Sequence, residues 1–284
     1  MPLIRIPFKG GFNKQITQSE AANQWTDGDF VRFRYGEPEK IGGWQQAVAT
    51  TMPGVARASH IWTDRDGTEY IAMGTSKGLF LFYGGGIYDI SPLETAITGL
   101  TFTSTNGSAT VTVNKTSHNL KAGEFVVFSS VTMPGSGTGF TAANFTDNPF
   151  QVITVASNSF TITMPSSESG SGITAAGSGT VQSYFPVGSA TQTLGFGWGT
   201  GTWNGSTAWG SATLASATSL EPGNWSLDNY GTILIATIKN GGTFEWNPTS
   251  GVTTRATAVT TNPTASVMTI VSDTDRHLIH LGTE

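Results

Sequence analysis

Acidic side chains recur at a spacing that could bind a cation. Asp64 and Asp66 lie in the segment TDRDG, and Asp273 and Asp275 lie in SDTDR. Asp-x-Asp opens calcium-binding loops, in which further oxygen ligands and a bidentate Glu follow. Neither segment supplies those later ligands, and Asp-Gly is typical of a hairpin turn. We therefore interpret both segments as turns between strands, and we expect no metal site.

The histidines do not form a catalytic or metal-binding pattern. His277 and His280 lie three residues apart on an expected strand, so their side chains should point to opposite faces of the sheet. His118 is expected in a loop as a hydrogen-bonded turn residue. The sequence has no cysteine and no G-x-S-x-G, P-loop or HExxH motif. We expect no catalytic residue and no cofactor, and hence no enzyme.

Three tryptophans punctuate the glycine-rich segment GFGWGTGTWNGSTAWG. Trp198, Trp203 and Trp209 could stack on sugars or bases, as exposed aromatic side chains do in stacking platforms. They could equally anchor a loop that has little else to bury. No basic or amide cluster accompanies the indoles, which favours anchoring over ligand binding.

Two arginines share one face of a strand expected at residues 30–35. Arg32 and Arg34 could contact phosphate groups. Glu37 and Glu39 follow closely, and this proximity favours local ion pairing instead.

The composition favours an all-β protein with a surface covered by partners. Charged residues are 12% of the chain, against about 25% in a typical soluble domain, and glycine is abundant. No Lys or Arg occurs between Lys121 and Lys239, which excludes extensive binding to nucleic acid because phosphate contacts require basic side chains. No apolar segment approaches the roughly 20 residues of a membrane span.

A pattern of strands and turns is repeated along the chain. IWTDRDGTEYIAMGTSKGLFLFY at 61–83 and WSLDNYGTILIATIKNGGTFEW at 225–246 share an aromatic start, a turn, an apolar run and an aromatic return strand. The segment 267–284 begins a third copy. Four strands in about 40 residues are typical of a propeller blade, and propellers usually need 4–8 blades. We therefore predict propeller blades that are incomplete in this chain, and we favour a piece of a longer protein.

The segments between the repeats predict further domains. Residues 98–186 contain Thr- and Val-rich strands and are expected to form a small inserted β-barrel or sandwich, with a flexible loop at 164–179. The predicted organisation is an N-terminal arm with strands (1–54), a first blade (55–97), the inserted β domain (98–186), a Gly/Trp-rich connecting loop (187–222) and further blades, the last one truncated (223–284).

Several motifs resemble one family of phage proteins. GDFVRFRYGEPEKIGGWQ is similar to the opening of short-tailed phage tail proteins, and GTEYIAMGTSKGLFLFYGGGIYDISP resembles the blade that follows it there. ATVTVNKTSHNLKAGEFVVFSS, GWGTGTWNGSTAWG and NWSLDNYGTILIATIKNGGTFEWN look like that family in the same order. The resemblance covers essentially the whole chain and points to the packaged-DNA stabilisation and tail-nozzle proteins of podoviruses.

The resemblance implies a structural virion protein, made in the host cytoplasm and located in the phage tail. It implies a ring of copies, six in number, beneath the portal and adaptor and beside other tail proteins. Such a ring would extend the DNA channel and retain the genome until ejection. Double-stranded DNA would pass without sequence-specific binding, and the low basic content suits a conduit along which phosphate groups slide.

Two other functions remain open from the sequence. One is a receptor- or glycan-binding tail module that uses Trp198, Trp203 or Trp209. The other is a propeller-type glycosidase or lyase, which would need convergent carboxylates in a concave site.

Overall fold

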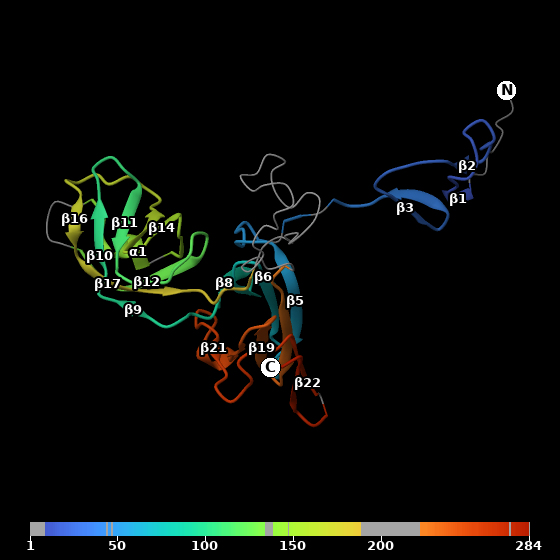
Figure 1. Cartoon of the computed structure of the whole chain (residues 1–284). Helices are drawn as coiled ribbons and strands as arrows, with labels where there is room; N and C mark the ends of the chain where they lie inside the picture. Colours follow the sequence, from blue (N-terminus) through green and yellow to red (C-terminus); the bar gives the residue numbers. More distant parts are fainter. Residues whose placement is uncertain are drawn as a thin grey trace, which may run out of the picture. The chain divides into compact units, whose positions relative to one another are not determined.

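The chain is described from a computed structural model (Figure 1). The structure describes residues 9–43, 45–46, 48–133, 139–146, 148–188, 222–272 and 274–283. The chain divides into two compact units, Met1–Ala49 and Thr50–Glu284. Within the described residues, helices that are long and apolar enough to cross a membrane are absent.

The N-terminal unit contains two small two-stranded sheets. Its strands are β1 (Lys9–Phe12), which pairs in parallel with β2 (Gln24–Trp25), and β3 (Val31–Arg34), which pairs antiparallel with β4 (Glu37–Lys40). Tyr35 and Gly36 form the turn of the β3–β4 hairpin, with φ angles of 53° and 86°. Two successive positive φ values are typical of the type I′ turn, whose twist matches that of the flanking strands.

The first repeat forms a four-stranded antiparallel meander, which we call blade 1. Its strands, paired in chain order, are β5 (Ala56–Thr63), β6 (Glu69–Thr75), β7 (Leu79–Tyr83) and β8 (Gly86–Asp89). Gly67 has φ +79° in the β5–β6 turn, a conformation that glycine adopts without steric cost. The hairpin signal Asp66–Gly67 therefore closes the expected turn.

The second repeat forms the same meander, which we call blade 2. Its strands are β18 (Trp225–Tyr230), β19 (Ile233–Ile238), β20 (Thr243–Trp246) and β21 (Thr257–Ala258), with the 3-10 turn η1 (Pro248–Ser250) before the last strand. The third repeat forms a two-stranded hairpin, which we call the third sheet: β22 (Met268–Val271) and β23 (Leu278–Leu281). The predicted fold class is confirmed: the chain is all-β, with propeller-like sheets.

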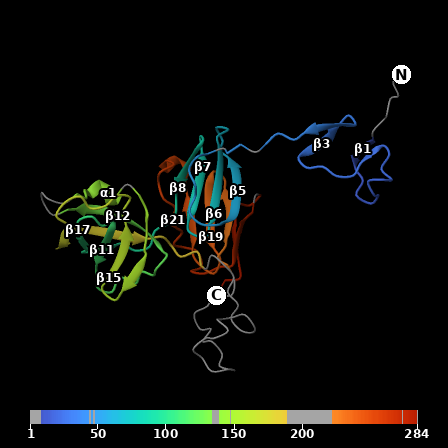
Figure 2. The same cartoon turned by 90° about the horizontal axis from the view of Figure 1, so that it is seen from above.

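Blades 1 and 2 pack face to face around one apolar core, as adjacent layers in Figure 2. The Trp225 indole lies directly on Gly74, where a Cβ would be 2.5 Å from the ring. Trp225 Nε1 donates to Thr75 O at 2.8 Å, and Trp62 Nε1 donates to Thr232 O at 3.0 Å. Each indole therefore places its apolar ring in the shared core and its N–H on the neighbouring blade.

Blade 2 contacts the third sheet through a polar layer. Thr237 Oγ1 in β19 donates to Thr269 Oγ1 in β22 at 2.8 Å, and Thr269 Oγ1 lies 3.1 Å from Nδ1 of His280. The Val271 N–H donates to Asp228 Oδ2 at 2.7 Å. Blade 2 is thus covered on one face by blade 1 and on the other by the third sheet.

The chain between β8 and β18 contains a separate domain of two sheets, which we call the inserted domain. One sheet has the order β14 (Thr154–Ala156), β15 (Ser159–Thr163), β11 (Thr110–Asn114), β10 (Thr101–Ser104), β16 (Ile173–Ala176); the other has β13 (Phe150–Gln151), β12 (Phe125–Thr132), β17 (Ser178–Ser183), β9 (Ile97–Thr98). Alternate strand residues enter its core, among them Phe102, Val111, Phe128 and Ile162, and Phe145 of the short helix described below joins them.

Two features of the inserted domain differ from the prediction. The expected flexible loop 164–179 contains strand β16, which pairs with β10, and Glu168, which is 1% exposed. Its carboxylate accepts hydrogen bonds from Ser104 Oγ and Gly170 N, both at 2.9 Å, and from Gly139 N. The Ser- and Gly-rich composition of the segment predicted flexibility and gave no sign that Glu168 is buried and hydrogen-bonded. The short helix α1 (Ala142–Thr146) was also not predicted; Asn144 Oδ1 accepts from the Thr141 N–H ahead of it.

Candidate functional site

The two arginines of β3 lie on one exposed face, and each has a local partner. Arg32 Nε donates to Glu39 Oε2 at 3.0 Å, and the hydrogen bond and charge of Glu39 raise the pKa of Arg32. The Arg34 guanidinium lies over the ring of Tyr35, 5.4 Å from its centroid. Tyr35 is itself 94% exposed. This geometry makes local pairing the main role of Arg32, because its guanidinium is already engaged by a carboxylate.

The remaining sequence-predicted positions lie partly outside the described residues. Trp198, Trp203 and Trp209 lie outside the described residues, so their anchoring or stacking role stays a prediction. Asp64 accepts from the Arg65 N–H within its hairpin turn. Across the described ranges, no three His, Cys, Asp or Glu side chains are grouped to hold a metal ion.

His118 serves as a turn residue in the inserted domain. Its side chain is buried, and Nδ1 accepts from the Leu120 N–H at 3.1 Å. Nε2 lies 2.9 Å from Ala156 O. Because Nδ1 accepts, the proton must sit on Nε2, which then donates to that carbonyl. Both ring nitrogens are therefore used to fix the loop, and neither is left for a ligand.

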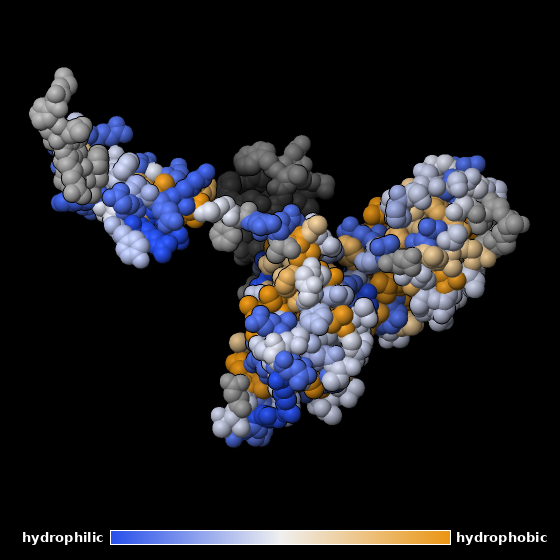
Figure 3. Space-filling view, turned by 180° about the vertical axis from the view of Figure 1, so that it is seen from behind, coloured by the Kyte–Doolittle hydropathy of each residue, from blue (hydrophilic) through white to orange (hydrophobic). Residues whose placement is uncertain are grey.

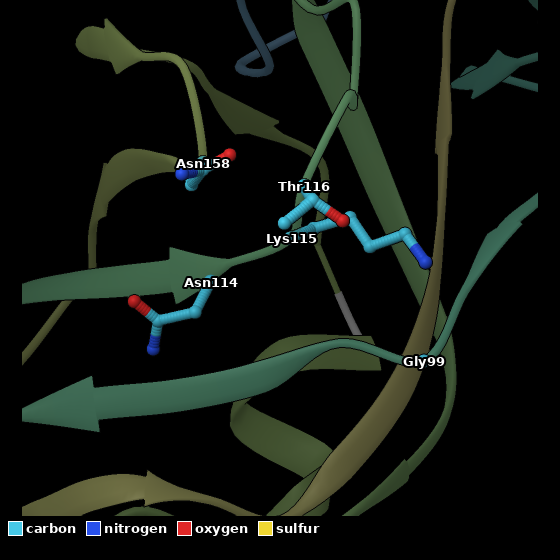
Figure 4. A pocket seen from close by; sticks show the side chains of 5 residues that line it. All are labelled: Gly99, Asn114, Lys115, Thr116 and Asn158. Carbon is cyan, nitrogen blue, oxygen red and sulfur yellow. The ribbon is translucent and has the colours of Figure 1, made fainter.

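A shallow polar pocket lies on the inserted domain, where β11 ends (Figure 4). Its volume is about 400 Å³, and it is lined by Gly99, Asn114, Lys115, Thr116 and Asn158. The Lys115 side chain extends from the strand end toward Gly99, where a Cβ would be 3.6 Å from Nζ. A Cβ at this distance would make only an ordinary contact, so the positive φ of Gly99 (72°) favours glycine there more than lack of space does.

The pocket offers both hydrogen-bond donors and acceptors. Asn114 Nδ2 donates to Thr103 Oγ1 at 2.9 Å, which orients its amide. The Lys115 N–H donates to Asn158 O at 2.9 Å, so backbone pairing holds the two lining segments together. An ammonium, a hydroxyl and amides on an open surface suit a small hydroxyl-bearing or anionic ligand.

A second pocket, of about 380 Å³, lies where the chain enters and leaves the inserted domain. It is lined by Glu94, Thr95, Ile97, Ser117, His118, Asn119 and Phe185. Ser117 and Asn119 have φ angles of 53° and 54°. Left-handed non-glycine residues are uncommon and cost free energy. The loop between β11 and β12 is therefore held in a strained form between the two pockets.

Three segments that are distant in sequence meet in one charged cluster. Asp89 ends β8, Tyr184 follows β17, and Arg255 precedes β21. Arg255 Nη2 pairs with Asp89 Oδ2 at 3.0 Å, Nη1 donates to Ser91 O at 3.0 Å, and the Tyr184 hydroxyl donates to Asp89 Oδ2. The guanidinium also lies 5.0 Å from the centroid of the Tyr184 ring. The cluster thus joins blade 1, blade 2 and the end of the inserted domain.

The electrostatics of this cluster favour its paired, charged form. Burial raises the pKa of Tyr184, and the Asp89 charge raises it further. Burial lowers the pKa of Arg255, but Asp89 and Tyr184 outweigh this effect, so the pKa of Arg255 is raised. Tyr184 therefore remains a neutral hydrogen-bond donor, and Asp89 is the acceptor shared by both partners. The raised pKa of Tyr184 suits a structural role better than that of a nucleophile, which requires a lowered pKa.

Sequence reasoning missed the polar pocket, the charged cluster and Glu168. The members of each lie far apart in the chain, as Asp89 and Arg255 do, so no local spacing joins them. The only signal was indirect: charged residues are scarce in this chain, and a partly buried charge must be paired.

No protein-family model and no curated protein matches the sequence. Among solved structures, the chain is similar to the one titled "Phage phi92 endosialidase", at 15% identity and a TM-score of 0.25. The match covers 87% of this chain and 36% of the other, so the chain spans about a third of that protein.

This likeness corrects the expectation that the chain is not an enzyme. The similar structure is named as an enzyme, and one β scaffold can carry several functions. The expectation was based on missing sequence motifs, and active-site carboxylates need not form a motif. At this TM-score, the likeness supports no particular activity for the chain.

Proposed function

We propose that this chain is a structural component of the tail of a short-tailed phage. It assembles with copies of itself into a ring that extends the DNA channel below the portal and adaptor, and it helps to retain packaged DNA until ejection. The motif resemblance described above supports the place in the tail. A ring of six copies is the arrangement that the resemblance implies.

The observation that carries the proposal is the stack of three propeller-type sheets with apolar end faces. Each inner face of the stack is covered by the next sheet, as the shared core of blades 1 and 2 illustrates. The end faces expose large side chains, including Ile61 at 65%, Met268 at 45% and Leu281 at 45%. On the face shown in Figure 3, hydrophobic residues lie exposed over the part that the blades form. Exposed apolar patches of this kind mark assembly surfaces.

The charge distribution supports passage of DNA without a tight hold. Lys and Arg are absent between Lys121 and Lys239, and the formal net charge of the chain is −5. A wall poor in basic side chains releases few counterions from DNA, and it therefore binds the phosphate backbone weakly.

Electron microscopy of the purified protein, and of the phage particles that contain it, tests this proposal. We expect ring-shaped particles with a central channel, and density for the same ring below the portal in the virion. Purified protein that stays monomeric, together with its absence from particles, would reject the proposal.

The polar pocket that Gly99, Lys115 and Asn158 help to line favours a second candidate function, a receptor- or glycan-binding module of the tail. Its amide, hydroxyl and ammonium groups suit the hydroxyl groups of a sugar. Glycan-array binding that is lost in Asn158→Ala and kept in Asn106→Ala would support this candidate. Absence of binding to any glycan on the array would reject it.

A further inference from the structure

The third sheet presents an apolar face that no described part of the chain covers. Its side chains alternate: Thr269 and Val271 are buried toward blade 2, whereas Met268 and Ile270 point away from it. Met268 pairs across the hairpin with Leu281, and Ile270 pairs with Ile279. These four residues are each 37–45% exposed. We call this surface the forward face.

Blade 1 presents a matching face at the other end of the stack. Ile61, Ile71, Phe82 and Ile87 are paired in register across all four strands, and they form one apolar row. The neighbouring residues Trp62, Tyr70 and Leu81 point the other way, into the core shared with blade 2. Ile61 is 65% exposed, and the rest of the row is partly exposed. We call this surface the backward face.

The contacts already present in the chain show how such faces pair. The face of blade 1 that lies opposite its backward face packs on one face of blade 2, and the other face of blade 2 packs on the third sheet. The three sheets are therefore stacked in one direction, which ends at the forward face. The hairpin turns also lie beside each other, because Trp62 near one turn donates to Thr232 in the next. A sheet placed on the open forward face in the same way continues an established interface.

The charges of the outermost turns are complementary in that arrangement. The β5–β6 turn of blade 1 carries Arg65 and Asp66, both exposed, and the turn of the third sheet carries Asp275 and Arg276, both exposed. Stacking in the register used within the chain brings the two turns together. Arg65 can then meet Asp275, and Arg276 can meet Asp66, so that charge selects the orientation.

We propose that the forward face of one copy docks on the backward face of blade 1 in a second copy. The contact is head-to-tail, so the same pair of faces joins every copy to the next, and such contacts close into rings where the rotation between copies permits. This inference rests on the proposed function and deepens it, because it names the surfaces that join neighbouring copies.

Light scattering and sedimentation over a wide range of concentration test the contact. We expect the purified chain to form oligomers, and Ile279→Lys or Ile61→Lys to yield monomers, because each places a charge in one of the two apolar faces. Ile153→Lys is the matched control: Ile153 is 50% exposed in the inserted domain, and this variant should remain oligomeric. Circular dichroism establishes that each variant is folded.

Mixing the two blocked variants gives the decisive result. The Ile279→Lys copy retains an open backward face, and the Ile61→Lys copy retains an open forward face, so the mixture should form a dimer that neither variant forms alone. A mixture that remains monomeric, or a wild-type chain that never associates, would overturn the inference.

The outcome separates this inference from the proposed function. Head-to-tail oligomers of a protein absent from phage particles would uphold the contact and reject the tail role. Tail rings that assemble equally well from the Ile279→Lys variant would uphold the tail role and reject the contact.

Discussion

Gly74 determines how closely the first two blades approach each other. The indole of Trp225 occupies the space in which any other residue would place its Cβ, 2.5 Å from the ring. The apolar pattern of the strand that contains Gly74 predicted that the strand is buried. It did not predict the contact between Gly74 and Trp225, because a glycine has no side chain that would show in a hydrophobic pattern. The need for glycine at position 74 arises from the packing of the two blades, and only the position of Trp225 in the structure shows it.

A methyl group at position 74 should therefore loosen the blade contact. We expect Gly74→Ala to lower the free energy of unfolding by roughly 1–3 kcal/mol, because overpacking shifts side chains from their preferred positions. Denaturant unfolding monitored by tryptophan emission measures the change. Gly42→Ala is the control, since nothing lies within 4 Å of a Cβ there. Equal stabilities of the two variants would contradict the expectation.

Glu168 is the buried carboxylate that fixes the segment between β15 and β16. Burial raises its pKa, but hydrogen bonds from Gly170, Ser104 and Gly139 outweigh burial, and the pKa is lowered. A lowered folded pKa adds stability above the unfolded value, near 4.3, and this stability is lost as the pH falls through the folded pKa. The inserted domain should therefore weaken in acid.

Replacing this carboxylate should remove that stability. In Glu168→Gln, an amide NH₂ would face donors such as the Gly170 N–H, and we expect a loss of about 1–3 kcal/mol at neutral pH. Thermal unfolding by circular dichroism at several pH values measures it, and the variant should lose less stability in acid than the wild type. Glu69→Gln, on an exposed strand position, should change little. A wild-type acid response in Glu168→Gln would refute the assignment.

At the scale of elements, the third sheet is attached to blade 2 through a polar layer that contains a histidine. His280 Nδ1 is 3.1 Å from Thr269 Oγ1, whereas Nε2 is buried and has no hydrogen-bond partner among the residues that the structure describes. Burial lowers the pKa of His280. The unfolded chain therefore binds a proton more readily than the folded one, and folding stability declines as the pH drops below about 6.5.

This attachment should accordingly weaken at mildly acidic pH. We expect the protection of β22 and β23 against hydrogen exchange to fall between neutral pH and pH below about 6, after correction for the intrinsic rate. His280→Gln should remove most of that pH dependence, while His277→Gln, at an exposed position, should keep it. A pH dependence that is unchanged in His280→Gln would show that another group is responsible.

The sequence predicted the elements whose signals are local. The meanders of blades 1 and 2 follow from alternating strands and short turns such as Asp66–Gly67, which pair residues close in the chain. Strand β16 escaped prediction because its stability comes from β10 and Glu168, both remote in sequence. Helix α1 escaped because one turn of helix is held mainly by burial of Phe145.

At the scale of the whole molecule, the inserted domain and the blades have separate apolar cores. Residues 98–186 contain no tryptophan. Trp62, Trp225 and Trp246 lie in the blade core. Tryptophan emission therefore reports the blades and other segments outside the inserted domain, such as Trp25 of the N-terminal unit, whereas circular dichroism reports all the sheets.

Separate cores should give separate unfolding transitions. We expect the two signals to report different midpoints in denaturant, because one cooperative unit would give coincident transitions. Phe145→Ala should lower the free energy of unfolding of the inserted domain by ~3–5 kcal/mol, since Phe145 is fully buried in the inserted core. Only the transition seen by circular dichroism should therefore shift. Coincident transitions that shift together in this variant would mean that the charged cluster at Arg255 couples both cores into one unit.

The candidate sites could be predicted less fully than the fold. The polar pocket needs Gly99 and Asn158 side by side, and the charged cluster needs Asp89 and Arg255. Each pair is brought together only by the topology of the sheets. Residue types alone do not predict which of these residues lie together in the fold, because the few charged residues and the many asparagines are scattered along the chain.

The bridge between Leu93 and Tyr184 has a consequence for how the chain reaches its native state. Blades 1 and 2 cannot dock until a long intervening segment has been closed into a loop, and the entropy lost grows with the length of that loop. Once the inserted domain has formed, the bridge holds its two ends together and shortens the loop that remains. We therefore expect the inserted domain to fold first and blade docking to be the slow, late step, which contact order also favours.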